Sequence, residues 1–368
     1  RQLLGAQMNL ARRVWNELTG SGNAAVTVPL LDGALRPNQR LETAEAIAEA
    51  PLADNIVSHQ GRLLFSSGRE LRALVDGRLL HTFDADITCL AAGPAGRLAV
   101  GVDRHGVSVL QGDKIAVPSL SGNISNVTAM AYGGGDLIVC EGSQKHGSRE
   151  WKHDLMAGGR DGAGTGSVWL FRENGDEIRL AHDLGYPNGV LVAKDGAVIV
   201  SESWRHRLIR LDADRPDQLQ VVLADLPAYP ARLSSGADGD IWLACVAPRS
   251  QLVEFVLREP KFRGRMVREV HPDYWIAPSL SSRSSFLEPL QGGSVKQMGV
   301  LKPWAPSRSY GLVIRLDADF NPIDSLHSRS DGTRHGTTSV FQDGSRLLVA
   351  SKGSGQIIVV PIEKGAAQ

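Results

Sequence analysis

Short apolar runs alternate with glycine-rich turns along most of the chain. A representative unit is YPNGVLVAKDGAVIVSES, residues 186–203, in which two apolar runs flank an Asp-Gly turn. Apolar runs of this length joined by short turns are typical of β-hairpins. Related units begin at glycines elsewhere in the chain, namely Gly61, Gly96, Gly135, Gly239 and Gly344.

The spacing of these units predicts the fold. Six such meanders recur, most of them about 40 residues apart, and a third apolar run follows several of them. A single meander cannot bury both of its faces, whereas meanders packed around a common axis can. We therefore predict an all-β fold, a six-bladed β-propeller, with a large β-sandwich or barrel as the alternative.

Two intervals are longer than a plain blade requires. Residues 144–166 interrupt the third blade, and residues 247–309 interrupt the fifth with a stretch of rough helical periodicity. Long insertions in a regular scaffold usually cover or shape a site, so we expect a lid of helices and loops. The predicted plan is an N-terminal helical extension and lead-in over residues 1–50, followed by the propeller over residues 51–368.

The charge balance narrows the choice of partners. The chain has 40 basic and 40 acidic residues, and the basic stretch at 261–268 has Glu259 and Glu269 beside it. This balance favours a small-molecule substrate over nucleic acid. No apolar run approaches the roughly 18 residues of a membrane span. Whether the protein is cytoplasmic, periplasmic or secreted stays open, as does a targeting or anchoring segment trimmed before Arg1.

Polar residues at the starts of the first strands are the candidate site. In a propeller these strands line a central channel, so their first residues converge on the axis. A carboxylate and two amides meeting there would suit a hard cation such as calcium. Spacing alone favours a plainer interpretation, in which Asp and Asn are turn formers. The residues concerned are Asp54, Asn126, Asn188, Arg232, Arg334 and His335.

Three segments carry a resemblance to a known family. Residues 29–57, residues 186–203 and the closing HGTTSVFQDGSRLLVASKGSG resemble the strictosidine synthase-like family, in particular its adipocyte plasma membrane-associated protein branch. Gluconolactonases and paraoxonases are more remote relatives. The likeness runs from Pro29 to Pro361 and includes both insertions. It implies a six-bladed propeller with a central metal or substrate pocket.

The resemblance also assigns metal positions. Asp54 matches an acidic ligand, and Asn126 and Asn188 match two amide ligands. The fourth position, an Asp in metal-binding relatives, is occupied here by Ala231-Arg232. Arginine cannot act as a ligand, and its charge repels a divalent ion. We therefore expect a degenerate metal site without a cofactor, in which Arg232 pairs with Asp54. Bound calcium or another divalent cation, and a surface position for Arg232, are the alternatives.

The catalytic residues of the relatives are not reproduced. The family's Pictet–Spengler condensation relies on a glutamate near the start of the last blade, where this chain has Arg334 or His335. A paraoxonase-type histidine dyad would need a histidine entering the second blade, which has none. We predict His335 as a base near neutral pH and Arg232 as its catalytic partner, although His335 could equally be structural. The predicted substrate-binding residues are Asp54, Asn126, Asn188, Glu202 and Arg334.

Two classes of function follow. The first is a hydrolase of the lactonase or esterase type that acts on a small, anionic or carbonyl-containing substrate, because arginine pairs well with carboxylates. The second is a non-catalytic small-molecule-binding or scaffold propeller. We favour the enzyme, because Asp54, Asn126 and Asn188 would still form a polar pocket.

Overall fold

The computed structural model describes residues 28–362 apart from residues 113, 117–123, 159–163, 217, 238, 283, 286, 290–295, 298–299 and 302–307. Within this part of the chain the strands form six four-stranded antiparallel sheets and one short two-stranded sheet. No helix in the same residues combines the length and apolar character needed to cross a bilayer. The helix predicted near the N-terminus lies outside the described residues.

Four of the sheets are meanders whose strands follow chain order. They are β2–β5 (Ala53–His59, Arg62–Ser67, Glu70–Ala73, Leu79–Thr82), β6–β9 (Ile87–Ala92, Arg97–Val102, Gly106–Gln111, Lys114–Ala116), β10–β13 (Val127–Gly133, Asp136–Glu141, Gly166–Phe171, Glu177–Leu184) and β14–β17 (Pro187–Val192, Val198–Glu202, Arg207–Leu211, Leu219–Leu223). The fifth sheet contains β18 (Ala228–Ser235), β19 (Ile241–Pro248), β22 (Leu312–Leu316) and β23 (Pro322–His327). The sixth contains β24 (Thr337–Asp343), β25 (Arg346–Ser351), β26 (Gln356–Pro361) and β1 (Glu45–Glu49).

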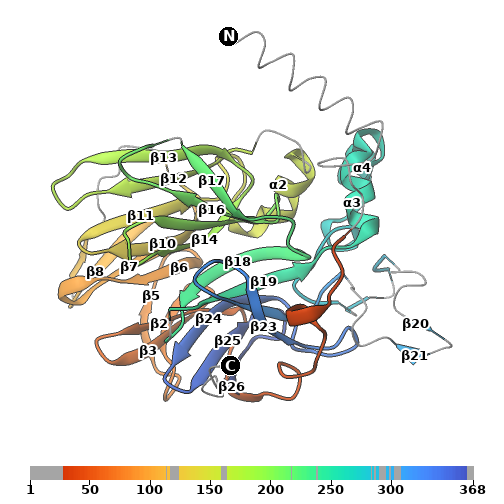
Figure 1. Cartoon of the computed structure of the whole chain (residues 1–368), viewed down its shortest axis with the longest axis horizontal. Coiled ribbons are helices and arrows are strands. Elements are labelled where there is room, and N and C mark those ends of the chain that lie inside the picture. Colours follow the sequence, from red (N-terminus) through yellow and green to blue (C-terminus); the bar gives the residue numbers. More distant parts are fainter. Residues whose placement is uncertain are drawn as a thin grey trace, which may run out of the picture.

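The first strand of each sheet packs against the first strand of the next. The contacts run from β2 through β6, β10, β14 and β18 to β24, and β24 contacts β2. The ring is therefore closed, and the prediction of a six-bladed β-propeller is confirmed (Figure 1). Each inner strand is the end strand of its own sheet, and the ring of blades encloses these edges and brings the starts of the inner strands to one place.

Strand β1 completes the last blade. It pairs antiparallel with β26, so that Glu45 lies opposite Val359 and Glu49 opposite Gln356. The structure therefore places β1 in the propeller, before the predicted boundary at residue 51. A five-residue segment with partly exposed side chains gives no strand signal of its own, because its pairing partner lies at the other end of the chain.

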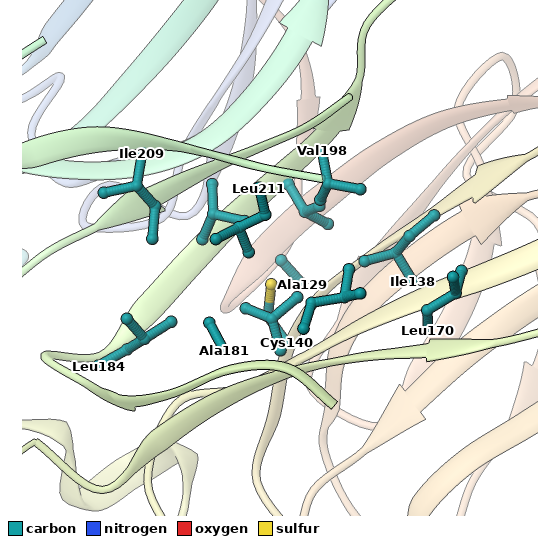
Figure 2. Packing of buried hydrophobic residues seen from close by; sticks show 13 residues of the cluster. Ala129, Ile138, Cys140, Leu170, Ala181, Leu184, Val198, Ile209 and Leu211 are labelled. Carbon is teal, nitrogen blue, oxygen red and sulfur yellow. The ribbon is translucent and has the colours of Figure 1, made fainter. Parts of the chain in front are cut away.

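Apolar side chains fill the space between neighbouring blades. Figure 2 shows this between the β10–β13 and β14–β17 sheets, where Ala129 and Cys140 meet Val198 and Ile209. Successive residues of a strand point to opposite faces, so each sheet presents one apolar face to each neighbouring blade. The apolar residues of the strands are used in the packing between blades, so the starts of the inner strands can carry polar residues.

The helices come from the two insertions. Between β11 and β12 lie η4 (Ser148–Glu150) and α2 (Trp151–Gly158); between β19 and β22 lie α3 (Gln251–Arg258), α4 (Pro260–Glu269), η5 (Pro272–Tyr274), β20 (Lys296–Gln297) and β21 (Val300–Leu301). Short 3₁₀ turns occur also at η2 (Gly33–Leu35) and η3 (Pro94–Gly96). Figure 1 shows α2, α3 and α4 together on one side of the sheets.

Leu41 offers a test of how the lead-in segment is held. Its side chain is fully buried against Trp242 and Ile358, and its N–H donates to the carbonyl of His327 at 2.9 Å. We expect Leu41→Ala to lower the free energy of unfolding by about 2–5 kcal/mol in denaturant titrations. Leu30→Ala, in the same segment but 79% exposed, should change it by less than about 0.5 kcal/mol. Equal effects would contradict the packing described.

Candidate functional site

A cavity of about 340 Å³ lies where the six inner strands converge. Every inner strand contributes one polar residue to its lining. In five strands this is the second residue of the strand, whereas in β18 it is the fifth. These residues are Asp54, Thr88, Thr128, Asn188, Arg232 and Thr338.

Both insertions contribute to the cavity wall. The first brings Ser148, Arg149 and Trp151 to the lining, and the second brings Pro278 and Leu280. The predicted covering of the site by the insertions is therefore present in the structure. Because these residues come from outside the blades, the shape of the cavity depends on where the insertions are anchored.

Aromatic side chains form one side of the cavity. The ring of Trp204 stacks on Tyr186 with centroids 4.6 Å apart, and it meets Tyr229 edge-on at 5.9 Å. The indole N–H of Trp204 donates to Asp154 of α2 at 2.8 Å, which fixes the ring and ties the first insertion to the blade. Tyr186 holds a positive φ of 61°, an uncommon conformation for a bulky residue at a strand start.

Asp54 is the centre of the polar side of the cavity. Its Oδ1 accepts hydrogen bonds from Nη1 of Arg232 at 3.0 Å and from the hydroxyl of Thr338 at 2.7 Å, and its Oδ2 accepts from Nζ of Lys352 at 2.9 Å. Arg232 also donates to the carbonyls of Thr338 and Thr88. The predicted pairing of Arg232 with Asp54 is confirmed, and Arg232 does not lie on the surface.

The two cations keep Asp54 ionised. Its side chain is only 3% exposed. Burial raises the pKa of Asp54, but the charges of Arg232 and Lys352, with hydrogen bonds from Thr338 and Lys352, outweigh this effect and lower the pKa to about 2. A carboxylate with such a low pKa is a weak base, so Asp54 positions charges rather than accepting protons near neutral pH.

Strands β14 and β15 fix the backbone that carries Arg232. Ser201 donates to the carbonyl of Ala231 at 2.6 Å, and Ser203 donates to the carbonyl of Pro230 at 2.5 Å. A Cβ atom at Gly189 would lie 2.2 Å from the Ala231 carbonyl oxygen, so only glycine permits this close approach. The Ser-Glu-Ser and Asn-Gly elements of one repeat thereby position the Arg232 side chain of the next.

Lys352 is a cavity residue that the sequence analysis missed. It follows β25 in the turn Lys352–Gly355, and its side chain is 27% exposed. The repeat pattern identifies the starts of the inner strands, whereas Lys352 reaches the cavity from the turn that follows β25, the second strand of the last blade. A lysine inside a glycine-rich turn was the only signal available, and it is a weak one.

Two other predicted residues lie off the cavity lining. Asn126 is buried, and its Nδ2 donates to the carbonyl of His146 at 2.8 Å. Glu202 is fully buried, bonded to Arg205 and Arg207, and it accepts a hydrogen bond from the N–H of Gly185. These contacts give Glu202 a position within the blade, away from the cavity that a substrate would enter.

His335 and Arg334 also lie outside the lining. His335 is 3% exposed, and its Nδ1 and Nε2 lie 2.8 Å from Ser309 Oγ and 2.7 Å from the carbonyl of Arg329. The lining position of the last blade belongs to Thr338, three residues further along. The catalytic role of His335 and the substrate-binding role of Arg334 stay predictions, and their positions do not favour them.

The predicted metal ligands can be tested for fit. The buried Oδ1 of Asn126 has no described partner and Asn188 lines the cavity, so both amides could serve a cation. Both oxygens of Asp54, however, accept hydrogen bonds from cationic groups, and a divalent ion there would face Arg232 and Lys352 at close range. This arrangement does not fit calcium.

Comparisons with known proteins agree with the fold. No protein-family model matches the chain. The chain is 23% identical over 307 residues to adipocyte plasma membrane-associated protein of Bos taurus, which covers 71% of this chain and 73% of the relative. It is 23% identical over 207 residues to protein strictosidine synthase-like 13 of Arabidopsis thaliana, which covers 55% of this chain and 47% of that relative.

Two solved structures illustrate the likeness of the chain to known propellers. A putative gluconolactonase matches with a TM-score of 0.51 and 13% identity over 86% of this chain and 91% of that chain. The calcium-binding protein regucalcin of Agrobacterium tumefaciens matches with a TM-score of 0.53 and 16% identity over 87% and 94%. At these identities the likeness concerns the fold. The chain is thus a six-bladed β-propeller with weak homology to adipocyte plasma membrane-associated protein and strictosidine synthase-like 13, and gluconolactonase- and regucalcin-like propellers are its structural neighbours.

Proposed function

We propose that the protein is a hydrolase-type propeller that cleaves a lactone or ester of a small anionic carbonyl compound in the cavity. The observation that carries this proposal is the convergence of Arg232 and Lys352 on one carboxylate, Asp54. The putative gluconolactonase among the structural neighbours supports the lactonase part as an analogy of fold, since one fold can carry several functions.

The charges of the lining favour an anionic ligand. The described residues that line the cavity include three cations, Arg149, Arg232 and Lys352. They include two anions, Asp54 and Asp86. Arg149 pairs with Asp86 at 2.6 Å, which leaves two cations around Asp54. A substrate carboxylate would restore the balance, and so would the negative charge that develops on a carbonyl oxygen when water attacks.

Lys352 and Arg232 have different roles in this proposal. An ammonium group has three N–H donors, and Lys352 gives one of them to Asp54, its only hydrogen-bond acceptor among the described residues. Its other donors can bind a carboxylate or a developing oxyanion. Nη1 and Nη2 of Arg232 already donate to Asp54 and to the carbonyls of Thr338 and Thr88. Arg232 therefore contributes a fixed charge and holds Asp54.

The proposal does not include the condensation of an amine with an aldehyde. Arg334 or His335 occupies the position of the family's glutamate, and the inner strand of the last blade presents Thr338 to the cavity. The aromatic side formed by Tyr186, Trp204 and Tyr229 would accommodate the carbon skeleton of the substrate.

A non-catalytic binding propeller is the second candidate. One observation favours it: the described residues that line the cavity include no histidine or cysteine, and the Asp54 carboxylate is fully engaged. Such a protein would bind the same anionic compounds without converting them. Turnover separates the two candidates, whereas binding alone does not.

Lys352→Gln tests the proposed substrate class. Lactones and esters that carry a carboxylate should be hydrolysed in preference to neutral analogues of the same size. We expect Lys352→Gln to lower kcat/KM for the anionic members by about 10- to 100-fold, since a charged hydrogen bond contributes roughly 1.5–3 kcal/mol. The neutral members should change by much less.

Lys194→Gln, which alters an exposed lysine outside the cavity, is the matched control and should behave like the unmodified protein. Carboxylate-bearing ligands that raise the melting temperature without being turned over would favour the binding propeller. A preference for neutral substrates that Lys352→Gln leaves unchanged would contradict both candidates. A mixture of tryptamine and an iridoid aldehyde should give no condensation product above the background without protein.

We further propose that the site works without a metal ion. The purified protein should contain well under one calcium per chain by elemental analysis, and chelators should leave its melting temperature unchanged. Replacing both cations, in Arg232→Asp with Lys352→Met, leaves two carboxylates facing the cavity, and calcium should then raise the melting temperature through binding to the folded state. Stoichiometric calcium in the unmodified protein would contradict the proposal.

The acid stability of the protein should report on Asp54. A pKa of about 2 in the folded state against 3.8 normally means that ionised Asp54 stabilises the fold above pH 4. This contribution, about 2 kcal/mol, is lost as the pH falls from 4 through 2. The difference in unfolding free energy between the unmodified protein and Asp54→Asn should shrink by about that amount over this range. A constant difference would show that Asp54 is not held by the two cations.

A further inference from the structure

Helix α3 exposes apolar side chains in addition to those that it buries. Its inner face buries Val253, Val256 and Leu257 in a cluster with the aromatic residues of the insertion and the cavity wall. Its outer face carries Leu252, 37% exposed, and Phe255, 53% exposed. A surface helix normally turns polar residues outward. The outer face of α3 therefore has no described covering.

The apolar surface extends over α4. Pro260 starts this helix and breaks it from α3 at Glu259, and Phe262 in its first turn is 50% exposed. Val270, directly after the helix, is 38% exposed. We refer to residues 251–270 as the helix pair. The helix pair thus exposes two phenylalanines and two aliphatic residues within twenty positions, and such a concentration of exposed apolar residues is a reason to look for an interaction site.

Basic residues surround these apolar side chains. Residues 251–270 contain five basic residues, namely Arg258, Lys261, Arg263, Arg265 and Arg268. Of their three acidic residues, Glu254 is buried and paired with Arg249 at 3.0 Å, Glu269 is paired with Arg265 at 2.8 Å, and Glu259 is exposed between the two helices. No described acidic group pairs with the exposed Lys261 or Arg268. The exposed surface of the helix pair is thus both apolar and positively charged.

We propose that the helix pair docks on the surface of an anionic lipid bilayer. Phe255 and Phe262 would enter the boundary between headgroups and acyl chains, while Lys261 and Arg268 would lie among the phosphates. Phenylalanine and leucine on one face with lysine and arginine around them are the composition of helices that lie in a membrane interface. This docking does not depend on the reaction proposed above.

The positive charge of the helix pair favours an anionic lipid surface over two other partners, residues 1–27 of the same chain and a second copy of the protein. Residues 1–27 of the same chain contain three arginines and one acidic residue, Glu17, so their net charge has the same sign as that of the helix pair. A second copy of the protein that docked through the same surface would also bring basic residues against basic residues. An anionic bilayer is complementary to the helix pair in charge as well as in apolar character.

Docking of the helix pair would also affect the cavity, because the helix pair packs against the cavity wall. The buried face of α3 shares its apolar cluster with Trp204 and Tyr229, and both of these residues line the cavity. Docking would hold the cavity wall against the bilayer, so that compounds that partition into the membrane surface lie close to the site.

Sedimentation with vesicles tests the proposal on the full chain. The protein should bind vesicles of phosphatidylcholine with phosphatidylglycerol at low salt, and should bind neutral phosphatidylcholine vesicles weakly. Phe255→Ser with Phe262→Ser should lower the affinity by at least about tenfold through lost apolar burial. Lys261→Gln with Arg268→Gln should lower it by about 30-fold, since each cation near an anionic surface contributes roughly 1 kcal/mol.

Matched controls remove the same residue types elsewhere. Leu219→Ser with Ile323→Ser replaces two partly exposed aliphatic residues in outer strands, and Arg78→Gln with Lys194→Gln removes two exposed charges. Both controls should bind vesicles like the unmodified protein, and all four variants should keep its melting temperature.

Three outcomes would overturn the proposal. One is the absence of binding to anionic vesicles at low salt. Another is a phenylalanine variant that binds as well as the unmodified protein. The third is a phenylalanine variant that loses thermal stability or self-association instead of vesicle binding, since the surface would then be covered by residues of this chain or by a second copy. Light scattering after gel filtration measures the self-association.

Discussion

The guanidinium group of Arg232 holds together the place where the blades meet. From β18 it reaches Asp54 on β2 and the carbonyls of Thr88 on β6 and Thr338 on β24, so one side chain connects four of the six inner strands. Apolar packing between the blades leaves these strand starts polar, and a buried carboxylate there needs compensation. Losing one partner of a buried ion pair costs about 3–5 kcal/mol, because the other charge then stays buried alone.

A second cation gives the same place its chemical character. Lys352 shares Asp54 with Arg232, and this surplus of positive charge is the reason for proposing an anionic substrate and a site that works without a metal ion. The insertions complete the site through ion pairs and hydrogen bonds of their own. Asp154 of α2 bonds Trp204 in the wall, and Glu254 of α3 is bonded to Arg249 at the end of the fifth blade's second strand. These contacts connect the cavity wall to the first insertion and the fifth blade to the helix pair.

Much of the fold follows from local sequence, whereas the site follows only in part. Glycine turns between apolar runs identify the blades, and the interrupted spacing identifies both insertions. The pairing of Asp54 with Arg232 follows from the loss of one expected carboxylate. Local sequence does not show which residue of each inner strand faces the cavity. In the third blade this residue is Thr128 and in the last blade it is Thr338, each a few residues beyond the predicted Asn126 and His335. Lys352 and the closing strand β1 depend on contacts between distant parts of the chain.

Crystals grown with calcium chloride would test most directly whether cationic side chains occupy the place of a metal. The informative measurement is an anomalous difference map of the cavity, together with the refined distances around Asp54. We expect no anomalous peak there, and we expect nitrogen atoms of Arg232 and Lys352 within hydrogen-bonding distance of the two carboxylate oxygens. A calcium ion bound by Asp54, Asn126 and Asn188, with Arg232 turned away from the cavity, would contradict this arrangement.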